Sequence, residues 1–272
     1  MDKKAISIMR VLDGLWETYE WVPVEEIESR MNLRPLRIKG IIRDLEGAGF
    51  IGWDSSGKMG VPSVKLKERG KDMLAVWDLK KHGVIDDLGH IIGEGKEAKV
   101  VLGLKGGKKI ALKFHRYYSA EFTKIRESLA YTALKWWKKK VGRIDRPVVV
   151  ERAKAQIEFR SLDKLAKSKK VNVPKPLGIN RHVIAMEFIG DDLSAPLLAD
   201  FGKQKSRFAD ATIEAYERAV EVGIVHGDMS EYNVMIWKGK PWLIDWPQAV
   251  PLSFPGAESL LERDRKRLKA IS

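Results

Sequence analysis

The sequence contains no cysteine, which excludes disulfide bridges, thiolate metal sites and cysteine nucleophiles. It also lacks any apolar run approaching the roughly 18 residues that a membrane-spanning helix needs. The charged start, 1–6, leads directly into a helical pattern and does not resemble a signal peptide. Few of the 5 histidines are clustered, so no imidazole metal site is indicated. These absences predict a cytoplasmic protein with no membrane partner.

Acidic residues are in deficit. The chain has 50 Lys and Arg against 37 Asp and Glu, a formal net charge of +13. This balance favours a polyanionic partner, because each neutralised phosphate releases condensed counterions. Nucleic acid or a ribonucleoprotein fits best. The alternative is a densely charged surface of the kind found in thermophiles, since 32% of the residues are charged.

Residues 1–82 have the pattern of a separate small domain. Apolar spacing predicts helices over 3–18, 24–31, about 36–45 and about 68–81, with a hairpin formed by 50–53 and 61–66. Three helices followed by a hairpin predict a winged helix-turn-helix. Basic residues on the third helix and the hairpin tip are candidates for nucleic-acid contact: Arg34, Arg37, Lys39, Arg43 and Lys58. A solvated basic face or a protein-docking module would look similar, so both readings stay open.

The clearest chemical signal lies in His-Gly-Asp-Met-Ser-Glu-Tyr-Asn (226–233) and the later Leu-Ile-Asp-Trp (243–246). Two apolar strands flank a polar loop that holds Asp228 and Asn233, and Asp245 ends the second strand. Phosphoryl transfer needs positioning and charge neutralisation more than covalent help. Asp228 can orient a nucleophile and accept its proton, while Asn233 and Asp245 offer the oxygen ligands that Mg²⁺ prefers. The spacing matches a kinase catalytic loop and its metal-binding aspartate. A plain hairpin with a capped turn leaves this spacing unexplained.

A second group of residues lies upstream. A glycine-containing turn at 91–101 lets backbone amides approach phosphates, and Lys113 is a single lysine in an apolar strand. Glu158, on a predicted helix, is assigned as the carboxylate partner of Lys113. A surface glutamate paired with Lys154 or Arg160 is the alternative. The apolar strand 183–189 is predicted to join two lobes and to bind an adenine edge, although a core strand would look alike.

Together these segments resemble the RIO atypical kinases. The motifs are G-E-G-K-E-A (93–98), I-A-L-K-F-H-R (110–116), I-E-F-R-S-L (157–162), the 226–233 loop and I-D-W-P-Q-A-V (244–250). The N-terminal module is similar to that of the second, winged-helix subfamily, and its archaeal branch fits best. The resemblance implies an α+β chain, with a winged helix-turn-helix over 1–82 and a compact bilobal kinase-like domain over 83–272. The lobes would span about 83–186 and about 190–272.

The family resemblance also implies chemistry and partners. It implies ATP with Mg²⁺ or Mn²⁺, serine autophosphorylation, and a role in maturing the small ribosomal subunit through its precursor particle and rRNA. No protein substrate beyond the chain itself is specified. The implied catalytic residues are Lys113, Asp228 and Asp245, and the implied metal ligands are Asn233 and Asp245. The implied nucleotide contacts are Gly93, Gly95, Lys96, Glu97, Lys99, Lys113, Glu158, Met186, Glu187, Ile189 and Ile244.

The segment 117–149 is long, and the resemblance makes part of it a mobile loop near the ATP site. Its candidate autophosphorylation sites are Ser119, Thr123, Ser128 and Thr132. Lysines interleaved with Tyr131, Trp136 and Trp137 suggest rRNA contact, whereas a helix packing its tryptophans into the core is equally compatible.

The sequence also departs from ordinary protein kinases. Gly227 stands where an arginine normally precedes the catalytic aspartate, and there is no Ala-Pro-Glu signature. A general peptide platform is therefore doubtful, and an ATPase switch with Asp245 as a transient phosphate acceptor is a further hypothesis.

Two rival functions remain. Small-molecule kinases of the aminoglycoside or choline type also use a His-Gly-Asp loop and an Ile-Asp-Trp strand, but the Gly-Lys-Glu-Ala turn and the winged helix argue against them. A nucleic-acid-binding regulator with an inactive kinase scaffold is the other rival. The intact set of Lys113, Glu158, Asp228, Asn233 and Asp245 argues against it.

Overall fold

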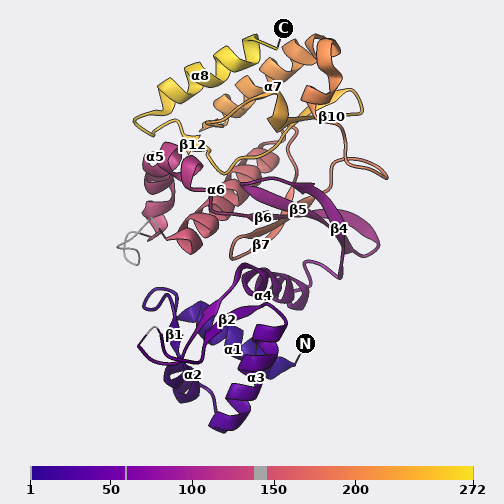
Figure 1. Ribbon diagram of the computed structural model, residues 1–272. Helices are drawn as coiled ribbons and strands as arrows, with labels where there is room; N and C mark the ends of the chain where they lie inside the picture. The colour runs from indigo at the N-terminus through magenta and orange to yellow at the C-terminus, as the bar shows by residue number, and fades with distance from the viewer. Residues whose placement is uncertain (1, 59, 138–145, 272) are drawn as a thin grey trace. The chain divides into compact units, whose positions relative to one another are not determined.

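The chain divides into two units, Met1–Lys81 and His82–Ser272, and each has its own hydrophobic core. The computed structural model describes residues 2–58, 60–137 and 146–271 (Figure 1). Within these residues, no helix has both the length and the apolar character to cross a bilayer.

The first unit packs helices against a small antiparallel sheet of strand order β1-β3-β2. Helix α1 ends at Gly14, short of the predicted residue 18, because glycine disfavours helix and the following N–H of Leu15 closes the last turn. Helix α3 buries Ile38, Ile42 and Leu45 on one face. Its elements are α1 (Lys3–Gly14), β1 (Val22–Pro23), α2 (Val24–Arg30), α3 (Pro35–Gly47), β2 (Ile51–Asp54), β3 (Ser63–Leu66) and α4 (Glu68–Lys81).

The second unit begins with a five-stranded antiparallel sheet of order β4-β5-β6-β8-β7. Helices α5 and α6 follow β6 in the chain; α6 packs against β6, β7 and β8, and α5 packs against α6 (Figure 1). Strand β8 ends at Glu187, before the predicted residue 189, and the Ile189 carbonyl instead accepts the Ala195 N–H at 2.9 Å. The elements of this half are β4 (Asp87–Glu94), β5 (Ala98–Lys105), β6 (Lys108–His115), α5 (Ser119–Trp137), α6 (Pro147–Ser168), β7 (Pro176–Asn180) and β8 (Val183–Glu187).

The C-terminal half of the second unit is mainly helical, with two short antiparallel strand pairs, β10–β11 and β9–β12. Helices α7 and α8 contact each other and hold the loop after β9 between them. The elements are η1 (Leu198–Phe208), α7 (Ala209–Glu221), β9 (Ile224–Val225), η2 (Glu231–Asn233), β10 (Val234–Trp237), β11 (Lys240–Leu243), β12 (Val250–Pro251) and α8 (Ala257–Lys269).

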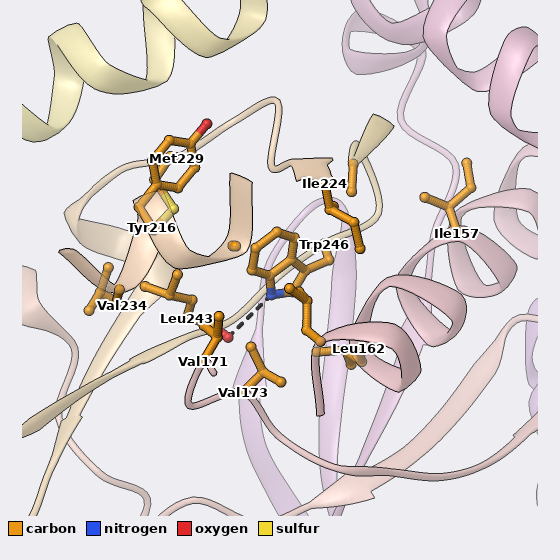
Figure 2. Close-up of a cluster of buried hydrophobic side chains, with 14 of the residues drawn as sticks. Ile157, Leu162, Val171, Val173, Tyr216, Ile224, Met229, Val234, Leu243 and Trp246 are labelled. Carbon is orange, nitrogen blue, oxygen red and sulfur yellow. Dashed lines mark hydrogen bonds between the residues drawn. The ribbon is translucent and has the colours of Figure 1, made fainter. Parts of the chain in front are cut away.

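Trp246 is the centre of the core of the second unit. Its side chain is 0% exposed and lies among apolar residues that include Leu162, Val173 and Ile224 (Figure 2). The indole Nε1 donates to the Leu243 carbonyl at 3.2 Å, so the buried polar atom is satisfied. Truncating a buried tryptophan costs about 3–5 kcal/mol. This anchor therefore fixes the backbone next to Asp245.

Candidate active site

A cleft of about 850 Å³ lies between the five-stranded sheet and the C-terminal half of the second unit. Its lining combines residues that lie far apart in the sequence. Of the residues predicted from the sequence, the cleft brings together Gly93, Gly95, Lys96, Glu97, Lys113, Glu158, Met186, Glu187, Ile189, Asn233, Ile244 and Asp245.

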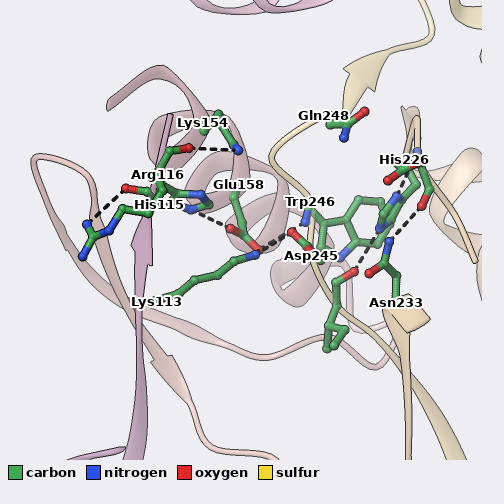
Figure 3. Close-up of polar contacts among 12 residues, drawn as sticks. Lys113, His115, Arg116, Lys154, Glu158, His226, Asn233, Asp245, Trp246 and Gln248 are labelled. Carbon is green, nitrogen blue, oxygen red and sulfur yellow. Dashed lines mark hydrogen bonds and ion pairs between the residues drawn. The ribbon is translucent and has the colours of Figure 1, made fainter. Parts of the chain in front are cut away.

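Lys113 is the charged centre of this cleft. Strand β6 lies inside the sheet, and its alternation points Ala111 and Lys113 to the cleft side. The Lys113 ammonium lies 2.8 Å from Glu158 Oε1 and 2.6 Å from Asp245 Oδ1 (Figure 3). Burial opposes its charge, but the carboxylates of Asp245 and Glu158 outweigh that effect and raise the pKa of Lys113. The lysine is thus held charged, facing an open volume.

Glu158 is held from several sides. It is 1% exposed on α6, and its Oε1 also accepts the Trp246 N–H at 3.2 Å. Burial favours its neutral form, but Lys113 and His115 lower the pKa of Glu158 well below its ordinary value. The predicted Lys113–Glu158 pairing is present in the structure, whereas Lys154 pairs with Glu121 instead, at 2.6 Å.

His115 is a contributor that the sequence reasoning marked only as part of a motif. It lies two residues after Lys113 on the same face of β6, and its Nε2 is 2.8 Å from Glu158 Oε2, at an angle outside ideal hydrogen-bond geometry. The ring is 0% exposed. Burial, helped by the charges of Lys113 and Lys154, lowers the pKa of His115 to about 4. The imidazole is therefore neutral near pH 7 and braces the carboxylate without adding charge.

The loop after β9 owes its shape to Gly227. Its φ is +82°, and a Cβ there would lie 2.7 Å from the Gln248 carbonyl oxygen. No side chain fits, which explains why the arginine of ordinary protein kinases is absent at this position. Asn233 Nδ2 donates to the Asp228 carbonyl at 2.8 Å, which leaves Oδ1 as the atom that can face a cation. Asp245 has φ +66°, a left-handed conformation that is uncommon outside glycine and concentrates at functional sites.

Asp228 does not line the cleft. It lines an adjacent cavity of about 250 Å³, and its Oδ1 lies 2.7 Å from Arg267 Nη1. Arg263 donates to the Gly227 carbonyl from the same helix, α8. The loop at Gly227 and Asp228 has no arginine of its own, and two arginine side chains of α8 contact it instead.

Asp264, also on α8, is a further residue that was not predicted from the sequence. It is 0% exposed and accepts the N–H groups of Gly227 at 2.8 Å and Met229 at 3.0 Å, together with the Tyr216 hydroxyl at 2.9 Å. Burial and this carboxylate raise the pKa of Tyr216, so the phenol stays a donor. Asp264 lies at helical spacing from the buried residues Ala257 and Leu268. An acidic residue on the apolar face of a predicted helix is the sequence pattern that could have identified it.

Lys99 requires a correction, since it does not contact the cleft. Strand alternation turns its neighbours Ala98 and Val100 toward the cleft and Lys99 to the opposite face. There its ammonium lies 5.5 Å from the centroid of the Phe114 ring. Conversely, Met235 of β10 lines the cleft and was not predicted.

The remaining predicted residues fall in three places. Arg34, Arg37, Lys39, Arg43 and Lys58 are all exposed in the first unit. Ser119 and Thr123 lie in the first turns of α5, whereas Ser128, farther along α5, lines the cavity that contains Asp228. The side chains of Trp136 and Trp137, and residues 138–145, lie outside the described residues.

The oxygen donors at the edge of the cleft suit a divalent cation that is shared with a substrate. Within the described ranges, no three His, Cys, Asp or Glu side chains converge as a self-sufficient metal site. Mg²⁺ is commonly held by one or two carboxylates plus substrate phosphates rather than by an all-protein cage. Asn233 and Asp245, at the edge of a cleft that also holds Lys113, fit such a shared site.

The RIO domain family matches residues 99–271. The chain is 31% identical over 256 residues to the RIO-type serine/threonine-protein kinase Rio2 of Methanocaldococcus jannaschii, covering 90% of this chain and 87% of that protein. It is 36% identical over 194 residues to Rio1 of Haloferax volcanii, covering 70% of this chain and 64% of that protein.

A solved structure has the same fold. It is described as the Rio2 kinase-ADP/Mg2+-phosphoaspartate complex from Chaetomium thermophilum, with a TM-score of 0.76 and 24% identity. The match covers 99% of this chain and 80% of that one. The predicted protein-kinase-like fold is thereby confirmed.

Proposed function

Because the chain belongs to the RIO domain family, whose members compared above are named serine/threonine-protein kinases, we propose that it is an ATP-dependent serine kinase. One observation carries the proposal. The cleft gathers one buried, doubly paired lysine, two oxygen donors suited to Mg²⁺ and a glycine-containing turn. A solved relative of the same fold is described with ADP and Mg²⁺.

Each residue has a defined task in this proposal. The backbone amides of the β4–β5 turn, with Gly93 and Gly95, approach the phosphates, and Lys113 contributes its charge to them. Met186, Ile189 and Ile244 bound the apolar end of the cleft, which suits an adenine ring. Asn233 and Asp245 would hold Mg²⁺, which supplies charge neutralisation at the transferring phosphoryl group. Asp228 orients the accepting hydroxyl and takes its proton.

A titration of the full chain with MgATP tests the nucleotide site. We expect saturable one-to-one binding that weakens strongly when EDTA removes the cation, and labelling of the chain by γ-labelled ATP. No binding with or without Mg²⁺ contradicts the kinase proposal and favours an inactive scaffold.

Ser128→Ala tests the autophosphorylation site, because Ser128 lines the cavity with Asp228. Ser119→Ala, at the start of α5, tests the rival candidate site: loss of label in Ser119→Ala but not in Ser128→Ala contradicts the assignment to Ser128.

A second activity, ATP hydrolysis through a phosphorylated aspartate, is favoured by the position of Asp245. Its carboxylate faces the cleft, with 40% of the side chain exposed, beside the Lys113 ammonium. The solved relative is described with phosphoaspartate. The carboxylate oxygen would attack the γ-phosphorus as ADP leaves, and water would then hydrolyse the acyl phosphate. Hydroxylamine should release part of the label. A label entirely stable to hydroxylamine and acid contradicts this route.

We further propose that the chain acts on precursors of the small ribosomal subunit, with the first unit as a winged helix-turn-helix that contacts rRNA. Support comes from the net charge of +13 and from the exposed basic residues on α3. The order of three helices and a β2–β3 hairpin agrees with such a module. Sedimentation with precursor particles, with and without ATP, tests the role. Free chain at the top of the gradient under both conditions contradicts it.

A further inference from the structure

The cavity beside Asp228 is separate from the nucleotide cleft but touches it. Glu97 and Tyr118 line both volumes. The other walls are the first turns of α5, the loop at Gly227 and Asp228, and the arginines of α8. The cavity therefore lies next to the phosphate end of the cleft, where a second substrate would have to sit.

Its volume limits what can enter. At about 250 Å³ it is smaller than the roughly 300–1,000 Å³ typical of sites for small-molecule ligands and cofactors. A second nucleotide or an aminoglycoside is too large to be enclosed there. One or two side chains of a polypeptide fit.

The positive charge of the cavity lies on its α8 wall. Arg263 and Arg267 lie one helical turn apart on α8, so both guanidinium groups reach the same wall. Opposite them, Glu121 is neutralised by Lys154 at 2.6 Å and shares a hydrogen bond with Glu97. Burial and Glu97 raise the pKa of Glu121 to about 7, whereas the Lys154 ammonium acts against that rise. Arg263 and Arg267 therefore face Asp228, while Glu97 and Glu121 lie on the far wall, where Lys154 pairs with Glu121.

The ion pair between Arg267 and Asp228 is the contact in this cavity that an incoming anion can replace. Its N–O distance is 2.7 Å, and each side chain is 43% exposed. Ion pairs as exposed as this are weak and are readily replaced. Arg263, in contrast, is engaged by the Gly227 carbonyl. Arg267 therefore is the group that can move to an incoming anion.

We propose that this cavity binds the phosphoryl acceptor as a polypeptide serine with an anionic side chain beside it, and that Arg267 selects that anion. The proposal rests on the kinase function proposed above. In this structure Arg267 pairs with Oδ1 of Asp228, the carboxylate that must receive the serine proton. A carboxylate or phosphate of the acceptor pairs with Arg267 and so releases the Asp228 carboxylate. Acidic acceptors are therefore selected because they free the group that takes the serine proton.

The transfer step balances with these groups. The serine oxygen attacks the γ-phosphorus of ATP, a new O–P bond forms, and the bond to the bridging oxygen of ADP breaks. The serine proton passes to Asp228 and then to solvent. ADP and the phosphoserine peptide are the products.

The experiment measures kcat/KM for peptides that differ only beside one serine. The flanking residues are glutamate, phosphoserine or glutamine, so the first two distinguish a carboxylate from a phosphate. With the full chain we expect at least a 10-fold preference in kcat/KM for an anionic flank. Arg267→Gln should remove that preference, and Arg267→Lys should retain part of it. Arg265→Gln is the matched control, because Arg265 lies on the same helix and pairs with Glu217 instead.

Two outcomes overturn the proposal: equal kcat/KM for acidic and neutral peptides, or a preference that survives in Arg267→Gln. Fluorescence anisotropy of the glutamate peptide, with a non-hydrolysable ATP analogue present, gives a readout independent of turnover. Failure of that peptide to bind also overturns the proposal. MgATP binding, measured separately, shows whether the kinase proposal stands when the acceptor proposal fails.

Discussion

At the scale of single residues, Asp245 combines three roles. It pairs with Lys113, offers an oxygen to Mg²⁺ and adopts a left-handed backbone that is anchored by its buried neighbour Trp246. We expect Asp245→Asn to lower ATP turnover at least about 100-fold, since loss of one preorganised charge in a catalytic site has effects of this size. The chain should stay folded, because the isosteric amide keeps the packing. Measurement of steady-state ATP turnover checks this expectation. Asp191→Asn, in an exposed loop, is the control. Near-normal turnover in Asp245→Asn contradicts the assignment.

His115 gives a pH-dependent prediction at the same scale. Burial holds the pKa of His115 at about 4, below its ordinary 6.5. Between these values the unfolded chain binds more protons than the folded chain, so stability is lost as pH falls through this window. His115→Gln removes that titration. Relative to the variant, the wild type should lose about 1 kcal/mol per pH unit between pH 6.5 and 4.5. The raised pKa of Glu121 acts in the opposite direction in both proteins and cancels.

Hydrogen exchange of the β6 amides across a urea series measures this difference, because it follows the second unit alone. His90→Gln, on the exposed side of β4, serves as the control. Parallel pH curves for wild type and His115→Gln show that the imidazole is not buried as described.

At the scale of elements, the C-terminal helix α8 holds the catalytic loop in shape. Asp264 accepts two backbone N–H groups of that loop and one phenol, all buried. Asp264→Ala leaves these donors unsatisfied, and we expect a loss of about 3–5 kcal/mol in the free energy of unfolding. Asp264→Asn keeps one acceptor oxygen, so this variant should fold. Its kcat should fall while its KM changes less, because the loop no longer places Asp228 correctly. Glu262→Asn, on the exposed side of α8, is the control. Unchanged kcat in Asp264→Asn contradicts a positioning role.

The same helix shows what the sequence could and could not predict. Lys113, Asn233 and Asp245 were predictable because each lies in a local pattern whose spacing reflects its chemistry, and Glu158 because a buried lysine needs a partner. Arg267 and Asp264 act through contacts formed only when α8 folds back onto a loop some 35–39 residues earlier in the chain. Lys99 was placed wrongly for a different reason. A glycine turn was treated as a whole, although strand alternation separates its residues into two faces.

At the scale of the whole molecule, the residues proposed for nucleic-acid contact and those proposed for phosphoryl transfer lie in different units. The cleft and the cavity beside Asp228 are built entirely from residues of the second unit. The exposed basic side chains on α3 belong to the first unit, opposite the buried face that contains Ile38 and Ile42. Nucleic-acid binding and phosphoryl transfer should therefore respond to different substitutions.

Replacing Arg37 and Arg43 with glutamine tests that separation. Each arginine that contacts a phosphate releases counterions, so each loss should reduce the slope of log K against log salt by about 0.7–1. Affinity for rRNA should fall across unrelated sequences alike, since phosphate contacts carry no base information. MgATP turnover should not change, because neither arginine lines the cleft. Replacing Lys80 and Lys81, both exposed at the end of α4, with glutamine controls for the loss of two positive charges. A salt slope unchanged in the double variant places the rRNA contact elsewhere, and a parallel fall in turnover shows that the two activities are not separable.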